Sequence, residues 1–160
     1  MWDSSKKLTN IAYFHFFLIF HSISNEIKTV GFKIIIELGF QAAIEPAKNE
    51  EVIKAFQPFF RTIFEFIFLE LVKNNDYYLR DIVALALYSL LCCYQNTYKE
   101  QVLEVLHLMG NYEAEQAIAR EFFEIVEAVG FQCSVNQNRL AFKKRFSDFI
   151  HKLHTLLSLR

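Results

Sequence analysis

The stretch from Glu50 to Lys73, EEVIKAFQPFFRTIFEFIFLELVK, decides the fold class. On a helix that turns by about 100° per residue, its apolar side chains spread over roughly 200° of the circumference. A helix at the edge of a domain needs a narrower stripe, so we expect this segment to have neighbours on two sides and its phenylalanines to be core. Pro58 predicts a kink or a break, because it cannot donate to the carbonyl of Lys54. The wide apolar face consists of Val52, Ile53, Phe56, Phe59, Phe60, Ile63, Phe64, Phe66, Ile67 and Leu71.

The composition fits one helical domain over residues 1–160. The chain has 18 Phe but only 4 Gly and 2 Pro, which favours long helices with few tight turns. The formal net charge is -1, so there is no overall attraction to nucleic acid or to an acidic membrane. No convincing strand alternation occurs, and Gly110 and Gly130 are natural helix ends. The expected helices run from Ser4 or Ser5 to His21, from Ser24 or Asn25 to Ala43, and over Glu50–Lys73, Tyr77–Tyr94, Tyr98–Met109, Tyr112–Val129 and Arg139–Leu159.

The last expected helix differs from the Phe-rich one, because its apolar residues fall within an arc of roughly 120°. It is expected to pack on one side only, as the end helix of a stack does. The segment Phe131–Asn138 before it is polar and is predicted to be an irregular loop. The apolar residues of this helix are Phe142, Phe146, Phe149, Ile150, Leu153, Leu156 and Leu157.

A pattern recurs between the second and fourth expected helices at an offset of 52 residues. Ile27-Lys28-x-Val30 corresponds to Leu79-Arg80-x-Ile82, and Ile35 and Leu38 correspond to Leu87 and Leu90. The second copy has the form of the inner helix of a HEAT repeat, in which small Ala positions let a partner helix approach closely. This predicts an all-α solenoid of antiparallel HEAT-type pairs with about seven helices. A generic helical bundle remains the alternative.

A resemblance to a known family covers most of the chain and is carried by four segments. They are Asn25–Leu38, NEIKTVGFKIIIEL; the pair of segments Phe56–Leu71 and Asp76–Leu91; and Leu140–Ile150, LAFKKRFSDFI. Together they resemble the carboxy-terminal HEAT repeats of the chromosome-region-maintenance exportin, the nuclear export signal receptor of the importin-beta/karyopherin superfamily. Phe142, Lys143, Asp148 and Phe149 match that family's final helix, whereas Gln95–Gln137 matches poorly.

The resemblance implies binding and transport rather than catalysis. A receptor of this kind carries leucine-rich export-signal cargo with Ran-GTP, contacts nucleoporins and shuttles between nucleus and cytoplasm. The family binds Ran and the export signal mainly through amino-terminal and central repeats, which this chain does not contain. The chain is therefore expected to be a terminal fragment, the translation of a truncated gene model or a degenerate paralogue. The alternative is a HEAT-repeat scaffold with no part in transport. In either case a functional surface is expected on the fourth-helix side or in the loop after Gly130.

No catalytic, cofactor-binding or metal-binding residue is assigned, and the chain is not expected to be an enzyme. Phosphate-binding glycine motifs and the GxSxG nucleophile motif are absent from the sequence. His151 and His154 have a spacing that suits a metal, but no further ligand completes a site. The basic run Lys143–Arg145 with Lys152 fits a solvated helix face or an acidic partner. The Glu113/Glu115 and Glu121/Glu124 pairs are expected on exposed faces, and Cys92, Cys93 and Cys133 are expected to be reduced core thiols.

The amino-terminal region allows a second alternative. Lys6 and Lys7 precede the apolar run Ile11–Phe20 and the small residues Ser22–Ser24, an order found in secretory signal peptides. The run is too short for a bilayer, which needs about 20 apolar residues. A buried helix is the favoured interpretation, and a secreted or membrane-associated helical protein with Met1–Ser24 as its leader is the alternative.

Overall fold

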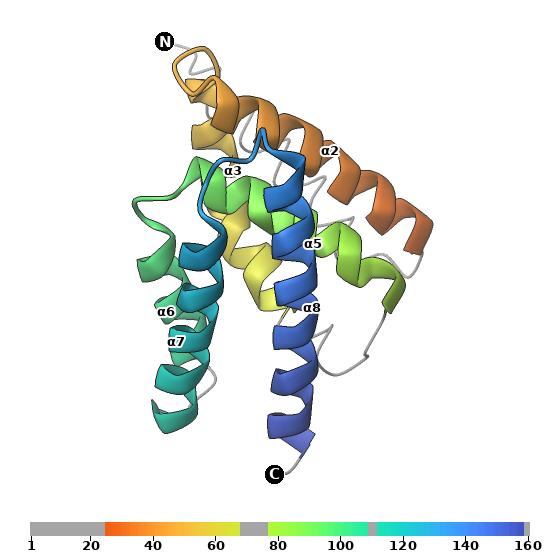
Figure 1. Ribbon diagram of the computed structural model, residues 1–160. Helices are drawn as coiled ribbons and strands as arrows, with labels where there is room; N and C mark the ends of the chain where they lie inside the picture. Colours follow the sequence, from red (N-terminus) through yellow and green to blue (C-terminus); the bar gives the residue numbers. More distant parts are fainter. Residues whose placement is uncertain (1–24, 68–76, 109–111, 159–160) are drawn as a thin grey trace.

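Helices account for almost the whole of the described chain (Figure 1). The computed structural model describes residues 25–67, 77–108 and 112–158, and in these ranges it has no strand, as the all-α prediction requires. The first expected helix, Ser4 or Ser5 to His21, lies outside them. The helices are α2 (Asn25–Ile44), α3 (Glu50–Phe66), α5 (Tyr77–Cys93), α6 (Tyr98–His107), α7 (Tyr112–Val129) and α8 (Asn136–Ser158).

Helix α5 lies at the centre and stacks on α2 in the same direction. The Ser89 hydroxyl donates to the carbonyl of Ile35 at 3.4 Å, and the Cys93 thiol donates to the carbonyl of Gly39 at 3.2 Å. In both bonds the partners are 54 residues apart, so the two helices advance together and are parallel, as Figure 1 also shows. Parallel stacking of the second helices of successive pairs is what a solenoid requires.

The two backbones approach closely at Gly39. A Cβ atom on this residue would lie 2.5 Å from the Oγ and 2.8 Å from the Cβ of Ser89. Ser89 is fully buried, and its hydroxyl also donates to the carbonyl of Ala86 at 2.7 Å. The absence of a side chain at residue 39 therefore sets the separation of α2 and α5.

Helix α3 has neighbours on more than one side, as its wide apolar face predicts. It packs on α2, α5 and α6. Its Phe64 ring meets Phe122 of α7 edge-on at 5.2 Å, Phe60 meets Tyr94 at 6.1 Å, and Phe66 lies 5.9 Å from Phe32 of α2. Of the kink or break predicted at Pro58, the break is wrong, because one continuous helix runs through this exposed proline. The expected continuation over residues 68–73 lies outside the described residues.

Helix α8 departs from the sequence prediction in two ways. It begins at Asn136, three residues earlier than expected, because a compact turn replaces the predicted loop. Within that turn the Arg139 guanidinium donates to the carbonyl of Cys133 at 2.6 Å, and Asn138 donates to the carbonyl of Gln132 at 3.1 Å. Side chains from the start of α8 thus provide hydrogen-bond donors for two backbone carbonyls of the preceding turn.

The single apolar face of α8 is buried as expected, but it has two neighbours. Phe142, Phe146 and Phe149 are buried where α8 packs on both α5 and α7. The Tyr88 ring of α5 stacks on Phe142 at 4.8 Å, and the Tyr88 hydroxyl donates to the carbonyl of Gly130 at 2.8 Å. In a regular solenoid of helix pairs, α7 would stack on α5. Here α8 occupies that position beside α5 instead. HEAT-type pairing in chain order joins the third expected helix with the fourth and the fifth with the sixth. The corresponding helices, α3 with α5 and α6 with α7, are in contact.

We predict that Gly39→Ala destabilises the protein by about 2 kcal/mol, in the range measured for overpacked cores. Helix propensity alone predicts the opposite sign, because Ala stabilises a helix relative to Gly by about 1 kcal/mol. Urea denaturation monitored by circular dichroism measures the difference. A Gly39→Ala variant as stable as the parent protein would show that the two helices are not held at this distance.

Gly130→Ala is the matched control. Gly130 ends α7 at φ 76°, and a Cβ there would meet nothing within 4 Å. The expected cost is about 1 kcal/mol, from backbone conformation alone. A second substitution that enlarges or removes the side chain at Ser89 should change the effect of Gly39→Ala and leave that of Gly130→Ala unaltered.

Candidate interaction surfaces

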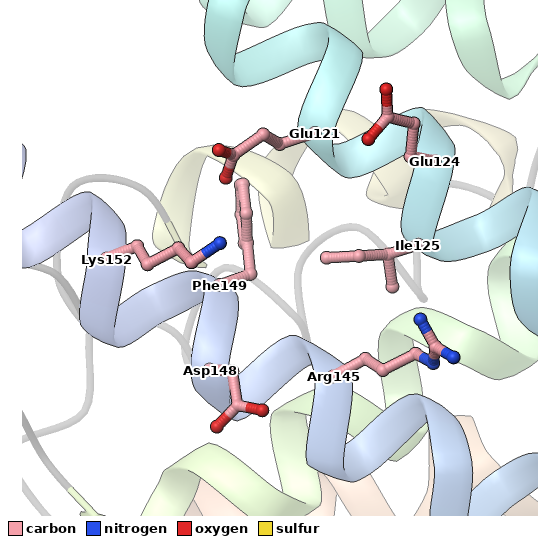
Figure 2. A pocket seen from close by; sticks show the side chains of 7 residues that line it. All are labelled: Glu121, Glu124, Ile125, Arg145, Asp148, Phe149 and Lys152. Carbon is pink, nitrogen blue, oxygen red and sulfur yellow. The ribbon is translucent and has the colours of Figure 1, made fainter.

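An open groove of about 270 Å³ lies between α7 and α8 (Figure 2). Phe149 and Ile125 form its floor, and charged side chains of both signs surround them. Figure 2 shows Lys152 of α8 extending towards Glu121 of α7, while Asp148 points away. A groove of mixed charge on an apolar floor suits a polypeptide segment rather than a single small anion. The lining residues are Glu121, Glu124, Ile125, Arg145, Asp148, Phe149 and Lys152.

The basic run of α8 does not form one patch. Lys143 lies on the α5 side, where its ammonium is 3.5 Å from the carboxylate of Asp81. Arg145 and Lys152 instead line the groove against α7, where Figure 2 shows Lys152 extending towards Glu121 and Arg145 lying on the side of Ile125. Successive helical residues diverge by about 100°, which separates these charges. The run therefore offers no continuous basic surface to an acidic partner.

One of the four glutamates expected on exposed faces is buried. The side chain of Glu115 is 7% exposed and lies 3.7 Å from the imidazole of His107, which is 81% exposed. Glu113 and Glu124 are exposed, and Glu121 is half-buried at the groove. Glu115 occupies the first turn of α7, where a carboxylate is favoured by the helix dipole.

The three cysteines converge although Cys133 is distant in sequence. Cys92 and Cys93 come from the end of α5, and Cys133 comes from the turn before α8. Burial raises the pKa of Cys92, and the neighbouring Cys133 raises it further. Burial likewise raises the pKa of Cys93 to about 12. All three are free thiols, as expected, and at neutral pH Cys92 and Cys93 are protonated and therefore poor nucleophiles.

Arg139 makes a contact that the sequence did not indicate. Its guanidinium lies over the ring of Phe40 at 3.9 Å from the centroid, while its Nε donates to the carbonyl of Cys133. It thereby ties the start of α8 to α2. The sequence placed Arg139 at the start of a predicted helix, but it gave no sign of the contact with Phe40. The contact serves the packing of the turn and lies beside a shallow pocket on α2.

The apolar pattern of α2 includes an exposed face. Helix α2 itself was predicted, but five of its large apolar residues are exposed, one of them Ile44 at the end of the helix. Phe32, Ile35 and Phe40 instead form the buried face. The other four exposed residues follow one another along the helix and are Ile27 at 52%, Val30 at 58%, Ile34 at 48% and Leu38 at 39%. We call these four residues the outer stripe of α2.

Metal and membrane sites are not found in the described part of the chain. No group of three or more His, Cys, Asp or Glu side chains gathers there in a way that could hold a metal ion, and this includes the region of His151 and His154. No helix in residues 25–67, 77–108 or 112–158 combines the length and apolar character needed to cross a bilayer. The segment Met1–Ser24, the leader of the alternative interpretation, lies outside these ranges.

We predict that alkali destabilises the fold through the buried thiols. The pKa of Cys93 is about 12 in the fold, above the value of about 8.5 for an unfolded thiol. The protonated Cys93 thiol contributes its full stabilisation below about pH 8.5. This stabilisation is lost as the pH rises through the pKa of Cys93 in the folded protein, because the thiol of the unfolded chain releases its proton at a lower pH. Urea denaturation between pH 7.5 and pH 10.5 or so should show a falling free energy of unfolding, and Cys93→Ala should flatten the decline. An unchanged slope in this variant would contradict the assignment.

Comparisons with known protein families, with curated proteins and with solved structures find no match.

Proposed function

We propose that the chain is a protein-binding helical-repeat module, and that it serves as the carboxy-terminal region of a nuclear export receptor. The parallel stacking of α2 on α5 is the observation that supports a repeat module. In this arrangement each helix pair is covered by the next, so an end pair presents an apolar face to further helices. The resemblance of Asn25–Leu38 and Leu140–Ile150 to the exportin family supports the finer assignment.

The kind of surfaces present supports binding rather than catalysis. The groove between α7 and α8 is open and lined by charged side chains, and the outer stripe of α2 is apolar and exposed. Exposed apolar residues in a row along one helix are typical of protein contact sites. In an export receptor, this region would act at the end of the superhelix and adjust its closure around Ran and cargo. Movement between nucleus and cytoplasm, and contact with nucleoporins, belong to the same proposal.

The first test is the coding sequence 5′ of Met1. Exportin-like repeats in the same transcript are the expected result. A stop codon and promoter there, without such repeats, would overturn the receptor assignment.

The second test measures assembly of the complete gene product. We expect it to bind a leucine-rich export-signal peptide at least about tenfold more tightly in the presence of GTP-loaded Ran than of GDP-loaded Ran, a coupling of about 1.4 kcal/mol. A peptide whose leucines are replaced by alanine is the matched control. Peptide binding that ignores the nucleotide would favour the alternative, a helical scaffold without a transport role.

A further inference from the structure

Helix α2 carries a seam with the residue spacing of a helix–helix contact. Its members follow one another at intervals of four, three and four residues and lie within about 60° of one another on the helix. The three large residues are exposed, whereas the one glycine is buried and leaves a gap between them. A pocket of about 280 Å³ opens at this gap, lined by Ile27, Val30 and Ile34 with Glu26 and the glycine itself. We call Ile27, Gly31, Ile34 and Leu38 the α2 seam.

The chain supplies a segment at one end of this seam. The apolar run Ile11–Phe20 lies outside the described residues, but only residues 21–24 separate it from Asn25, where α2 begins. The chain from Phe20 to Asn25 spans at most about 17 Å, so the end of the run lies near the start of α2. Loops of about two to five residues join antiparallel helices. This connection therefore favours a run that folds back along α2.

Folding back through residues 21–24 aligns the run with the α2 seam. In an antiparallel pair, a residue that lies a given number of places before the connection is level with the residue the same number of places after it. Three apolar residues of the run have the same intervals as the seam read backwards, and the largest of them is level with the glycine. The level pairs are Ile11 with Ile34, Phe14 with Gly31 and Leu18 with Ile27.

The opposite face of the run does not meet the seam in this register. Tyr13 and Phe17 are level with Phe32 and Lys28, neither of which belongs to the seam. Phe32 is buried and already packs on Phe66 of α3. The run is apolar all round, so its second face remains for contacts with other helices. The register thus selects one face of the run for α2.

The charges at the far end of the seam agree with this register. Lys7 precedes Ile11 by one helical turn and is level with Leu38. It lies within about 2 Å, along the axis, of Glu37, which is exposed and of opposite charge. The nearest lysine of α2 in level is Lys33, about 7 Å further along the axis. The pair therefore brings opposite charges together and keeps like charges apart.

We propose that the α2 seam is the docking site of this chain's own segment Ile11–Leu18, which packs on it as an antiparallel helix with Phe14 against Gly31. The absence of a side chain at residue 31 leaves the room that the phenylalanine ring fills. The proposal does not depend on the export-receptor assignment, because both surfaces belong to one chain. It leaves Val30, at the edge of the seam, and the groove between α7 and α8 for other proteins.

Disulfide cross-linking tests the register in the full chain. Ile11→Cys with Ile34→Cys, and Leu18→Cys with Ile27→Cys, place two thiols at one level, so copper–phenanthroline oxidation should link most of each variant as a monomer. The matched control, Ile11→Cys with Ile27→Cys, separates the thiols by about 10 Å along the axis and should stay reduced. Peptide mapping under non-reducing conditions identifies the linked residues.

Three outcomes of the cross-linking would overturn the proposal. The first is that the matched pairs stay reduced. The second is that the control pair links as fully as the matched pairs. The third is a product of dimer size, which would place the seam between two copies of the chain.

Cleavage by chymotrypsin tests the docking without added thiols. Ile34→Asp puts a carboxylate into the seam at an exposed position, so cleavage within Ile11–Phe20 should become about tenfold faster than in the parent chain. Leu108→Asp, at a leucine that is 63% exposed at the end of α6, should leave that rate unchanged. Far-UV circular dichroism checks that both variants keep their helices. Equal cleavage rates in the parent chain and in Ile34→Asp would contradict the docking.

Discussion

The contact between Gly39 and Ser89 is the constraint on which the rest of the arrangement depends. It lets α2 and α5 approach until the thiol and hydroxyl of α5 reach the carbonyls of α2. With α5 held at this distance, the phenylalanines of α3 fill the space beside both helices, and α8 packs on another side of α5. A larger side chain at residue 39 would separate the two central helices and loosen every layer that packs on them.

The sequence predicted the helices well and their neighbours less well. Apolar periodicity and helix-end residues located both ends of α2, α5 and α7 and the start of α3 to within one residue, because these are local properties of the chain. Which helix covers a face is a tertiary property. Hydropathy therefore missed both the place of α8 between α5 and α7 and the exposure of Val30 and Ile34. It also gave no weight to Gly39 and Ser89, whose importance lies in the space that they leave.

For the candidate surfaces too, the sequence identified local features but not the contacts between helices. The sequence identified the charged residues of α8, but Lys143 turned out to pair with Asp81 while Arg145 and Lys152 line the groove with Glu121. The position of each residue around the helix determines this separation and could be calculated in advance. The cation–π contact of Arg139 with Phe40 could not, because it joins residues from α8 and α2 that only the folded chain brings together.

The central position of α5 also affects the order in which the chain can assemble. Its side-chain hydrogen bonds to other segments join residues far apart in sequence, from 42 for Tyr88 with Gly130 to 67 for Arg80 with Ser147. Long chain segments must close before these contacts form, and their closure entropy slows folding. During synthesis α2 and α3 emerge before α5, whereas α8 emerges last. Until α8 has been synthesised, Tyr88 has neither its stacking partner, the ring of Phe142, nor its hydrogen-bond acceptor, the carbonyl of Gly130, held in place by the turn before α8. The nascent chain therefore exposes its future core helix to other nascent chains and to chaperones until translation of α8 is complete.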